Sequence, residues 1–329
     1  MTRRLSAPRL IAIGFAVFMG LGTLLLTLPT STHGGISWVD AFFVSVSPVS
    51  VTGLTSVPFP GTFTTFGTVV VMLLVQVGGL GVMIFTTLGT VLIGQRVGFR
   101  NLLTVRDELG STDSPRNIFR LIGQIAGITL LVEAAGAVVL AAGFIGSGIG
   151  YGQGLFQGVF HAIAAFCNAG FVALPDGDLT SYAGAPSVNL TLVALIVLGG
   201  LGFPVLVNLY HYRQMRRLAL HSKLVLVTSA TLVLIGVLSV AFLEWTNPAT
   251  LGGEPTATRL WESLFQGVTP RTAGFSTVDY AQMRESTLFL QIGLMFIGTA
   301  PASTGGGSRS RLSRSWCSSY SRKCGGRRM

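Results

Sequence analysis

Long and short apolar stretches alternate along the chain. Six are long enough to cross a bilayer, and they predict membrane-spanning helices at about 10–29, 66–94, 118–143, 188–211, 223–243 and 287–302. A spanning helix needs about 20 apolar residues. The three shorter stretches fall well below that length and are typical of helices that enter a membrane without crossing it. They are Trp38–Val49, Gly154–Phe166 and Thr258–Thr269.

Each short stretch runs into a small-residue turn with a glycine at its centre. The turns are Val51-Thr52-Gly53, Asn168-Ala169-Gly170 and Thr272-Ala273-Gly274, and their glycines are 117 and 104 residues apart. A second repeated motif, Gly-Gly-Leu-Gly, follows at 78–81 and at 199–202. The chain therefore repeats one unit: spanning helix, short helix, glycine loop, spanning helix.

This unit has the properties of a cation site. Non-helical backbone at membrane depth persists only where it lines a watery cavity or is buried in protein. A short helix that ends there points the negative end of its dipole at the cavity, which favours a cation. The following glycine adopts positive φ at little cost, and rings of carbonyl oxygens can then replace the hydration shell of an ion. The spacing predicts that these loops form one filter.

Composition supports a membrane protein. Half of the 329 residues are hydrophobic and 10% are charged, whereas soluble domains carry about 25% charged residues. The net charge of +10 does not indicate a nucleic-acid partner, because seven of the 22 basic residues lie after Gly307, where no acidic residue occurs. The three cysteines have no metal-ligand spacing and do not form a disulfide framework.

Charge placement predicts the topology. No Lys or Arg falls between Leu10 and Gln95 or between Leu121 and Tyr212, whereas basic residues gather at 96–120 and again at 213–223. Because basic loops stay in the cytoplasm, we expect a multi-pass protein of the cell (inner) membrane with a cytoplasmic N-terminus. Residues 172–186, with two aspartates and no basic residue, should lie outside.

Four segments together resemble the Trk/Ktr/HKT superfamily of potassium-uptake membrane subunits. They are Pro48–Thr55, Phe166–Phe171, Thr269–Ser276 and Gly298–Gly307. The resemblance implies an all-α membrane protein of tandem parallel helix–pore-helix–helix (M1-P-M2) units, three here of an expected four, around one pore. It implies a filter that binds K⁺ through backbone carbonyls of Val51, Thr52, Gly53, Asn168, Ala169, Gly170, Thr272, Ala273 and Gly274. It also implies a gate loop at Ser303, Thr304, Gly305, Gly306 and Gly307.

The resemblance further implies partners. Members usually form homodimers on a cytosolic nucleotide-binding regulatory subunit, while the chain itself binds no cofactor and only transports K⁺. Its domains would be a first unit (1–94), a basic cytoplasmic loop (95–117), a second unit (118–212), a third unit (213–307) and a tail (308–329). Preference for K⁺ over Na⁺ stays open.

The tail at 308–329 predicts a frameshift. Its Ser- and Arg-rich sequence has no helical apolar period, whereas a shifted reading frame would make Ser315 to Ser321 apolar. We therefore expect the tail to be non-native and disordered, and this chain to be inactive alone for want of a fourth unit. A native tail that binds anionic lipid is the alternative.

Rival functions fit less well. No zinc-helix, nucleophile-elbow or P-loop motif is present, so we expect no enzyme. A secondary transporter of another solute also uses broken helices, but its repeats are often inverted. A non-transporting pseudogene product is the remaining alternative. Glu133 fits ion handling or structural anchoring, and Arg271 fits either vestibule repulsion or helix capping.

Overall fold

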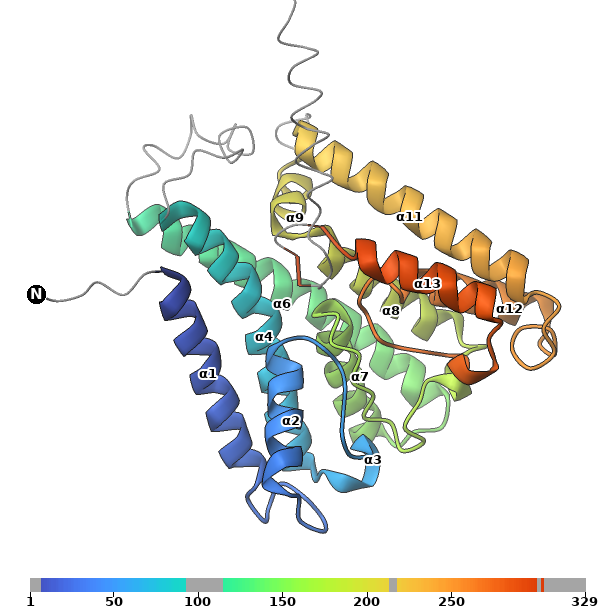
Figure 1. Ribbon diagram of the computed structural model, residues 1–329, viewed down its shortest axis with the longest axis horizontal. Helices are drawn as coiled ribbons and strands as arrows, with labels where there is room; N and C mark the ends of the chain where they lie inside the picture. Colours follow the sequence, from blue (N-terminus) through green and yellow to red (C-terminus); the bar gives the residue numbers. More distant parts are fainter. Residues whose placement is uncertain (1–6, 93–114, 213–217, 301–302, 305–329) are drawn as a thin grey trace, which may run out of the picture.

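The fold is built from long and short helices (Figure 1). The computed structural model describes residues 7–92, 115–212, 218–300 and 303–304. Within these ranges the regular structure is helical, with one isolated β-bridge between Thr32 and Phe63. The predicted all-α fold is therefore confirmed.

The same order of elements recurs along the chain. The first group is α1 (Ala7–Leu26), α2 (Trp38–Val49), the one-turn α3 (Phe59–Thr62) and α4 (Thr65–Leu92). The second is α6 (Pro115–Gly146), α7 (Tyr151–Phe166), the 3₁₀ turn η2 (Thr180–Tyr182), α8 (Pro186–Leu201) and α9 (Phe203–Tyr210). The third is α11 (Leu220–Glu244), α12 (Thr256–Val268), η3 (Tyr280–Gln282) and α13 (Glu285–Ile297). The short helices α2, α7 and α12 correspond to the three predicted short stretches.

Helix α7 lies at the centre of the fold (Figure 1) and contacts α4, α6 and α8. Its Phe160 and Phe166 are fully buried, as are Phe144 of α6 and Phe171 just beyond the helix. A helix that is buried around most of its circumference can hold the adjoining loop in one place, because packed interiors deform little.

The segment predicted as one span at 188–211 is broken. Helices α8 and α9 meet at an angle of 105°, and the residue between them, Gly202, has φ 84°. Only glycine adopts this conformation cheaply. Pro204 lies in the first turn of α9, where proline is tolerated, so the break lies at Gly202 and not at the proline.

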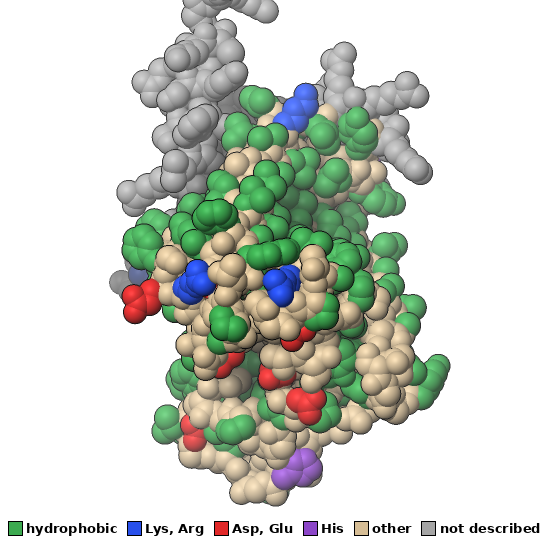
Figure 2. Space-filling model, turned by 90° about the vertical axis from the view of Figure 1, so that its right-hand side faces the viewer, with side chains coloured by type: hydrophobic (Ala, Val, Ile, Leu, Met, Phe, Trp, Pro, Cys, Tyr) green, Lys and Arg blue, Asp and Glu red, His purple; other side chains and the backbone are tan. Residues whose placement is uncertain are grey.

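The membrane-facing surface is apolar. Within the described residues, Ile122–Gly146 and Leu220–Glu244 are long and apolar enough to span a membrane, and the bent α8–α9 pair would be a third span. Phe242, Phe289 and Phe296 are more than 70% exposed, which suits contact with lipid. Figure 2 shows hydrophobic side chains over the upper part of one face and acidic side chains lower down.

Some predictions fall on residues outside the described ranges. The basic loop predicted at 95–117 is described only from Pro115, where α6 begins. Gly305, Gly306 and Gly307 of the predicted gate loop and the whole tail at 308–329 also lie outside.

Candidate functional site

The three glycine loops meet beside one another in space. A Cβ on Gly53 would overlap the carbonyl oxygen of Ala169, and a Cβ on Gly170 would lie 3.0 Å from Cα of Gly274. The second loop therefore lies between the first and the third, although more than a hundred residues separate successive loops in sequence. The backbones approach so closely that no side chain fits between them.

The loops share an unusual backbone conformation. Gly53, Gly170 and Gly274 all have positive φ, between 66° and 77°. So do the residues two positions earlier, Val51, Asn168 and Thr272, with φ between 54° and 68°. A β-branched residue in the left-handed region costs about 1–2 kcal/mol, and such strain clusters at functional sites. The sequence predicted positive φ for the glycines only.

The ends of the short helices explain this conformation. In α2, the N–H of Thr52 donates to Ser47 O (2.9 Å) and that of Val51 to Pro48 O (3.1 Å). In α7, Ala169 donates to Ala164 O and Asn168 to Ala165 O. These pairs define a Schellman motif, whose C′ residue is left-handed. The helix thus ends abruptly and its terminal carbonyls face the loop.

Polar side chains of the short helices hold the far side of each loop. Ser47 Oγ accepts a hydrogen bond from the N–H of Leu54 (2.8 Å), and Gln157 Nε2 donates to Ala173 O (2.6 Å). In the third loop Thr269 Oγ1 donates to Phe275 O (2.5 Å). Sequence analysis missed these residues. For Ser47 and Gln157 the signal was a polar side chain on a mostly apolar short helix.

A cavity of about 610 Å³ opens over the three glycines. Its lining includes Gly53, Gly170 and Gly274 together with Asp176 and Asp178, and no Lys or Arg contributes to it. Burial raises the pKa of the nearby Tyr182 hydroxyl, and the negative charge of Asp176 raises this pKa further. Two carboxylates and no basic side chain in its lining make the cavity electronegative.

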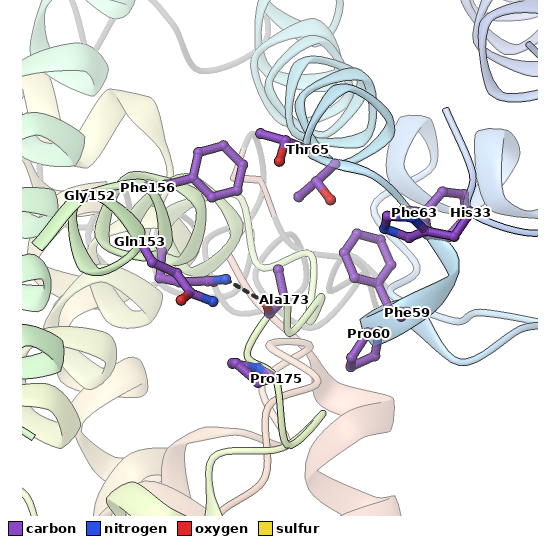
Figure 3. Close-up of a pocket in the computed structure, with 13 residues that line it drawn as sticks. His33, Phe59, Pro60, Phe63, Thr65, Gly152, Gln153, Phe156, Ala173 and Pro175 are labelled. Carbon is purple, nitrogen blue, oxygen red and sulfur yellow. Dashed lines mark hydrogen bonds between the residues drawn. The ribbon is translucent and has the colours of Figure 1, made fainter. Parts of the chain in front are cut away.

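A second cavity of about 520 Å³ lies alongside and shares Phe59, Pro60 and Pro175 with the first. Figure 3 shows Phe156 and Gln153 of α7 across from Phe59 and Phe63. The dashed line in the figure is the bond from Gln157 to Ala173. Its aromatic lining lies beside the second loop, whose Ala173 and Pro175 also line it.

The described part of the predicted gate loop touches the second glycine loop. Thr304 Oγ1 donates to Phe166 O (3.0 Å) and accepts from Asn168 Nδ2 (2.9 Å). Ser303 Oγ donates to Ala300 O (2.6 Å). The helical path of α13 ends at Ile297, so the non-helical segment begins at Gly298, earlier than the predicted start at Ser303.

Three further titratable residues, Glu133, Arg271 and His161, are buried at separate places in the fold. Glu133 of α6 is 4% exposed and accepts a hydrogen bond from Gln76 Nε2 of α4 (3.0 Å). Arg271 is 4% exposed, so it does not project into the cavity over the three glycines. Its Nη2 donates to Ser229 Oγ of α11 (2.9 Å). His161 is fully buried and packs edge-on against Phe144 and Phe160.

Parallel helical units with re-entrant short helices and clustered glycine loops define a class of membrane transport proteins. The model of the TrkH family, described as cation transport proteins, matches residues 3–315. The chain belongs to this family. It is 40% identical over 304 residues to the Ktr system potassium uptake protein B of Bacillus subtilis (strain 168), covering 92% of this chain and 68% of that protein.

Other relatives agree. The potassium/sodium uptake protein NtpJ of Enterococcus hirae is 36% identical over 309 residues, covering 93% of this chain and 67% of that protein. The crystal structure of the potassium transporter TrkH from Vibrio parahaemolyticus shares the fold, with a TM-score of 0.71 and 20% identity, over 100% of this chain and 65% of that one. The chain thus spans about two thirds of the length of these relatives.

Proposed function

We propose that this chain is the pore-forming membrane subunit of a potassium-uptake system. The observation that carries the proposal is the meeting of three loops with one shared backbone conformation at the ends of three short helices. Similarity to proteins named for potassium uptake supports the choice of ion.

In this proposal the loops form a filter for dehydrated K⁺. Positive φ at two residues, with a residue of negative φ between them, turns successive carbonyls toward the same side of the backbone. Carbonyl oxygens gathered on one side can replace the water around an ion. The abrupt ends of α2, α7 and α12 add the negative ends of three helix dipoles. The filter residues are the three triplets Val51–Gly53, Asn168–Gly170 and Thr272–Gly274.

The outer cavity would concentrate cations before they reach the filter. Asp176 and Asp178 line it without a basic residue, and a cleft lined by one sign of charge raises the local concentration of counter-ions. The geometry suits inward movement from the outside, as uptake requires.

Control would come from the cytoplasmic side. In this proposal the gate is the loop Ser303–Gly307, whose Thr304 hydroxyl donates to Phe166 O at the end of α7. We propose a homodimer in the cell (inner) membrane, with a cytoplasmic N-terminus, that binds a cytosolic nucleotide-binding regulatory subunit. Two relatives are named as proteins of a Ktr system, which supports a multi-component assembly.

Uptake in a host that lacks its own potassium transporters tests the proposal. Two forms are expressed. One is this chain alone, and the other is this chain fused to the part of the Bacillus subtilis relative that lies outside the aligned residues. We expect rubidium and potassium uptake, with a smaller sodium component, from the joined protein. Because one relative is named for both potassium and sodium, both ions are measured. Uptake of neither ion by either form would overturn the proposal.

A further inference from the structure

A buried polar cluster lies directly behind the second glycine loop. Its members come from three helices: Gln76 from α4, Glu133 from α6 and Cys167 at the C-terminal end of α7. Glu133 Oε2 accepts from Gln76 Nε2 (3.0 Å), and Cys167 Sγ lies 4.0 Å from Glu133 Oε1, at the outer limit for a thiol donor. Cys167 immediately precedes Asn168, the first residue of the filter triplet.

The packing brings this cluster together tightly. Gln76 and Gly79 are three residues apart, so they share one face of α4. A Cβ on Gly79 would overlap Cys167, which means that α4 presses against the thiol through the space that glycine leaves. Glu133 is 4% exposed and Cys167 is fully buried. The side chains therefore have few alternative positions.

The architecture does not itself require a carboxyl group here. In the first unit, the short helix is tied to its outer helix by a neutral bond from Ser45 Oγ to Met19 O (2.6 Å). In the third, Arg271 is tied to Ser229 (2.9 Å). A buried carboxyl is costly in a membrane, so its use where a neutral serine bond suffices in the first unit points to a role in the function of the adjacent loop.

We propose that Glu133 is a positioning residue of the filter, one that sets ion selectivity by holding Cys167 and hence the second glycine loop against α4. The carboxyl touches no ion. It acts by supplying two acceptor oxygens on a rigid helix, one for the Gln76 amide and one for the thiol. This inference rests on the proposed ion path.

Two variants and one matched control test the proposal. Glu133→Ala removes both acceptors, while Glu133→Gln keeps the shape and one amide oxygen. Glu244→Gln alters another buried carboxyl, 1% exposed, whose hydrogen bonds go to Asn247, Thr250, Arg284 and Thr287, away from the glycine loops. Thermal stability is measured for each, so that loss of folding is separated from loss of selectivity.

The main readout is the ratio of rubidium to sodium uptake, in the form of the protein that supports uptake. We expect Glu133→Ala to lower this ratio several-fold, Glu133→Gln to lower it less because one acceptor remains, and Glu244→Gln to leave it within twofold of the starting protein. An unchanged ratio in Glu133→Ala, or an equal fall in Glu244→Gln or Glu133→Gln, would overturn the positioning role.

A second readout does not depend on transport. In the 329-residue chain with Cys317→Ser and Cys324→Ser, the infrared S–H stretching band belongs to Cys167 alone. We expect this band to shift to higher frequency in Glu133→Ala, because the thiol loses its acceptor. An unmoved band would overturn the inference. A shifted band in a protein without uptake would support the contact and count against the proposed function only.

Discussion

Asn168 and Thr304 are joined by a buried hydrogen bond of 2.9 Å between Nδ2 and Oγ1. One residue begins the second glycine triplet and the other belongs to the non-helical segment after α13. Thr304 also donates to Phe166 O, so one hydroxyl joins the end of a short helix, a glycine loop and the proposed gate. Both side chains are at most 2% exposed.

Replacing this hydroxyl should weaken the gate. Thr304→Val keeps the shape but leaves Phe166 O and Asn168 Nδ2 unpaired, and a buried unpaired group costs about 1–3 kcal/mol. We expect faster potassium uptake with less dependence on the regulatory subunit, measured by rubidium influx with and without that subunit. Thr191→Val is the control, because its exposed hydroxyl bonds only within α8. Equal rates in Thr304→Val and the control would contradict the gate assignment.

The glycines of the loops should tolerate no side chain. A Cβ on Gly170 would lie 2.9 Å from Ala273 O, and the positive φ adds about 1–2 kcal/mol for a residue other than glycine. We expect Gly170→Ser and Gly274→Ser to reduce potassium selectivity, measured as the ratio of rubidium to sodium uptake. Gly20→Ser serves as control, since nothing lies within 4 Å of its Cβ position. Unchanged selectivity in both loop variants would refute the filter.

A side chain added where α8 contacts α7 should lower the stability of the protein. A Cβ on Gly199 would overlap the backbone carbonyl of Phe166, whereas at Gly123 nothing lies within 4 Å. Because backbone cannot yield as a flexible side chain can, Gly199→Ala should cost at least the 1–3 kcal/mol typical of overpacking. Melting of the detergent-solubilised protein should fall by several degrees, while Gly123→Ala should not lower it. A similar melting temperature for both would show that the helices separate freely.

The cavity over the three glycines should open to the outside of the cell. Asp178 lines it and is exposed, so in a background with Cys317→Ser and Cys324→Ser, Asp178→Cys should react with an impermeant maleimide in intact cells. Cys167 is fully buried and supplies the unlabelled background. Arg100→Cys, in the predicted cytoplasmic loop, should react only after permeabilisation. The reverse pattern would invert the topology.

Much of the fold was determined by the sequence alone. The apolar pattern located the short helix Trp38–Val49 with the same bounds as in the structure. Length did not separate every spanning helix from the short ones, because α13, in the predicted span 287–302, has the same 13 residues as the short helix α12. The recurring glycines located the loops, because a turn with positive φ leaves a local signature in residue type. Charge asymmetry supplied a topology that stays a prediction.

Other features were decided by the tertiary structure. The left-handed conformation of Val51 and Asn168 follows from the hydrogen bonds at the ends of α2 and α7. Residue preference opposes this conformation at Val51, as it does at Thr272. The break at Gly202 was not predicted either. The hydrogen bond between Glu133 and Gln76 joins residues 57 positions apart, and that between Thr304 and Phe166 joins residues 138 positions apart. Such long-range partners leave no local pattern, since only folding brings them within reach.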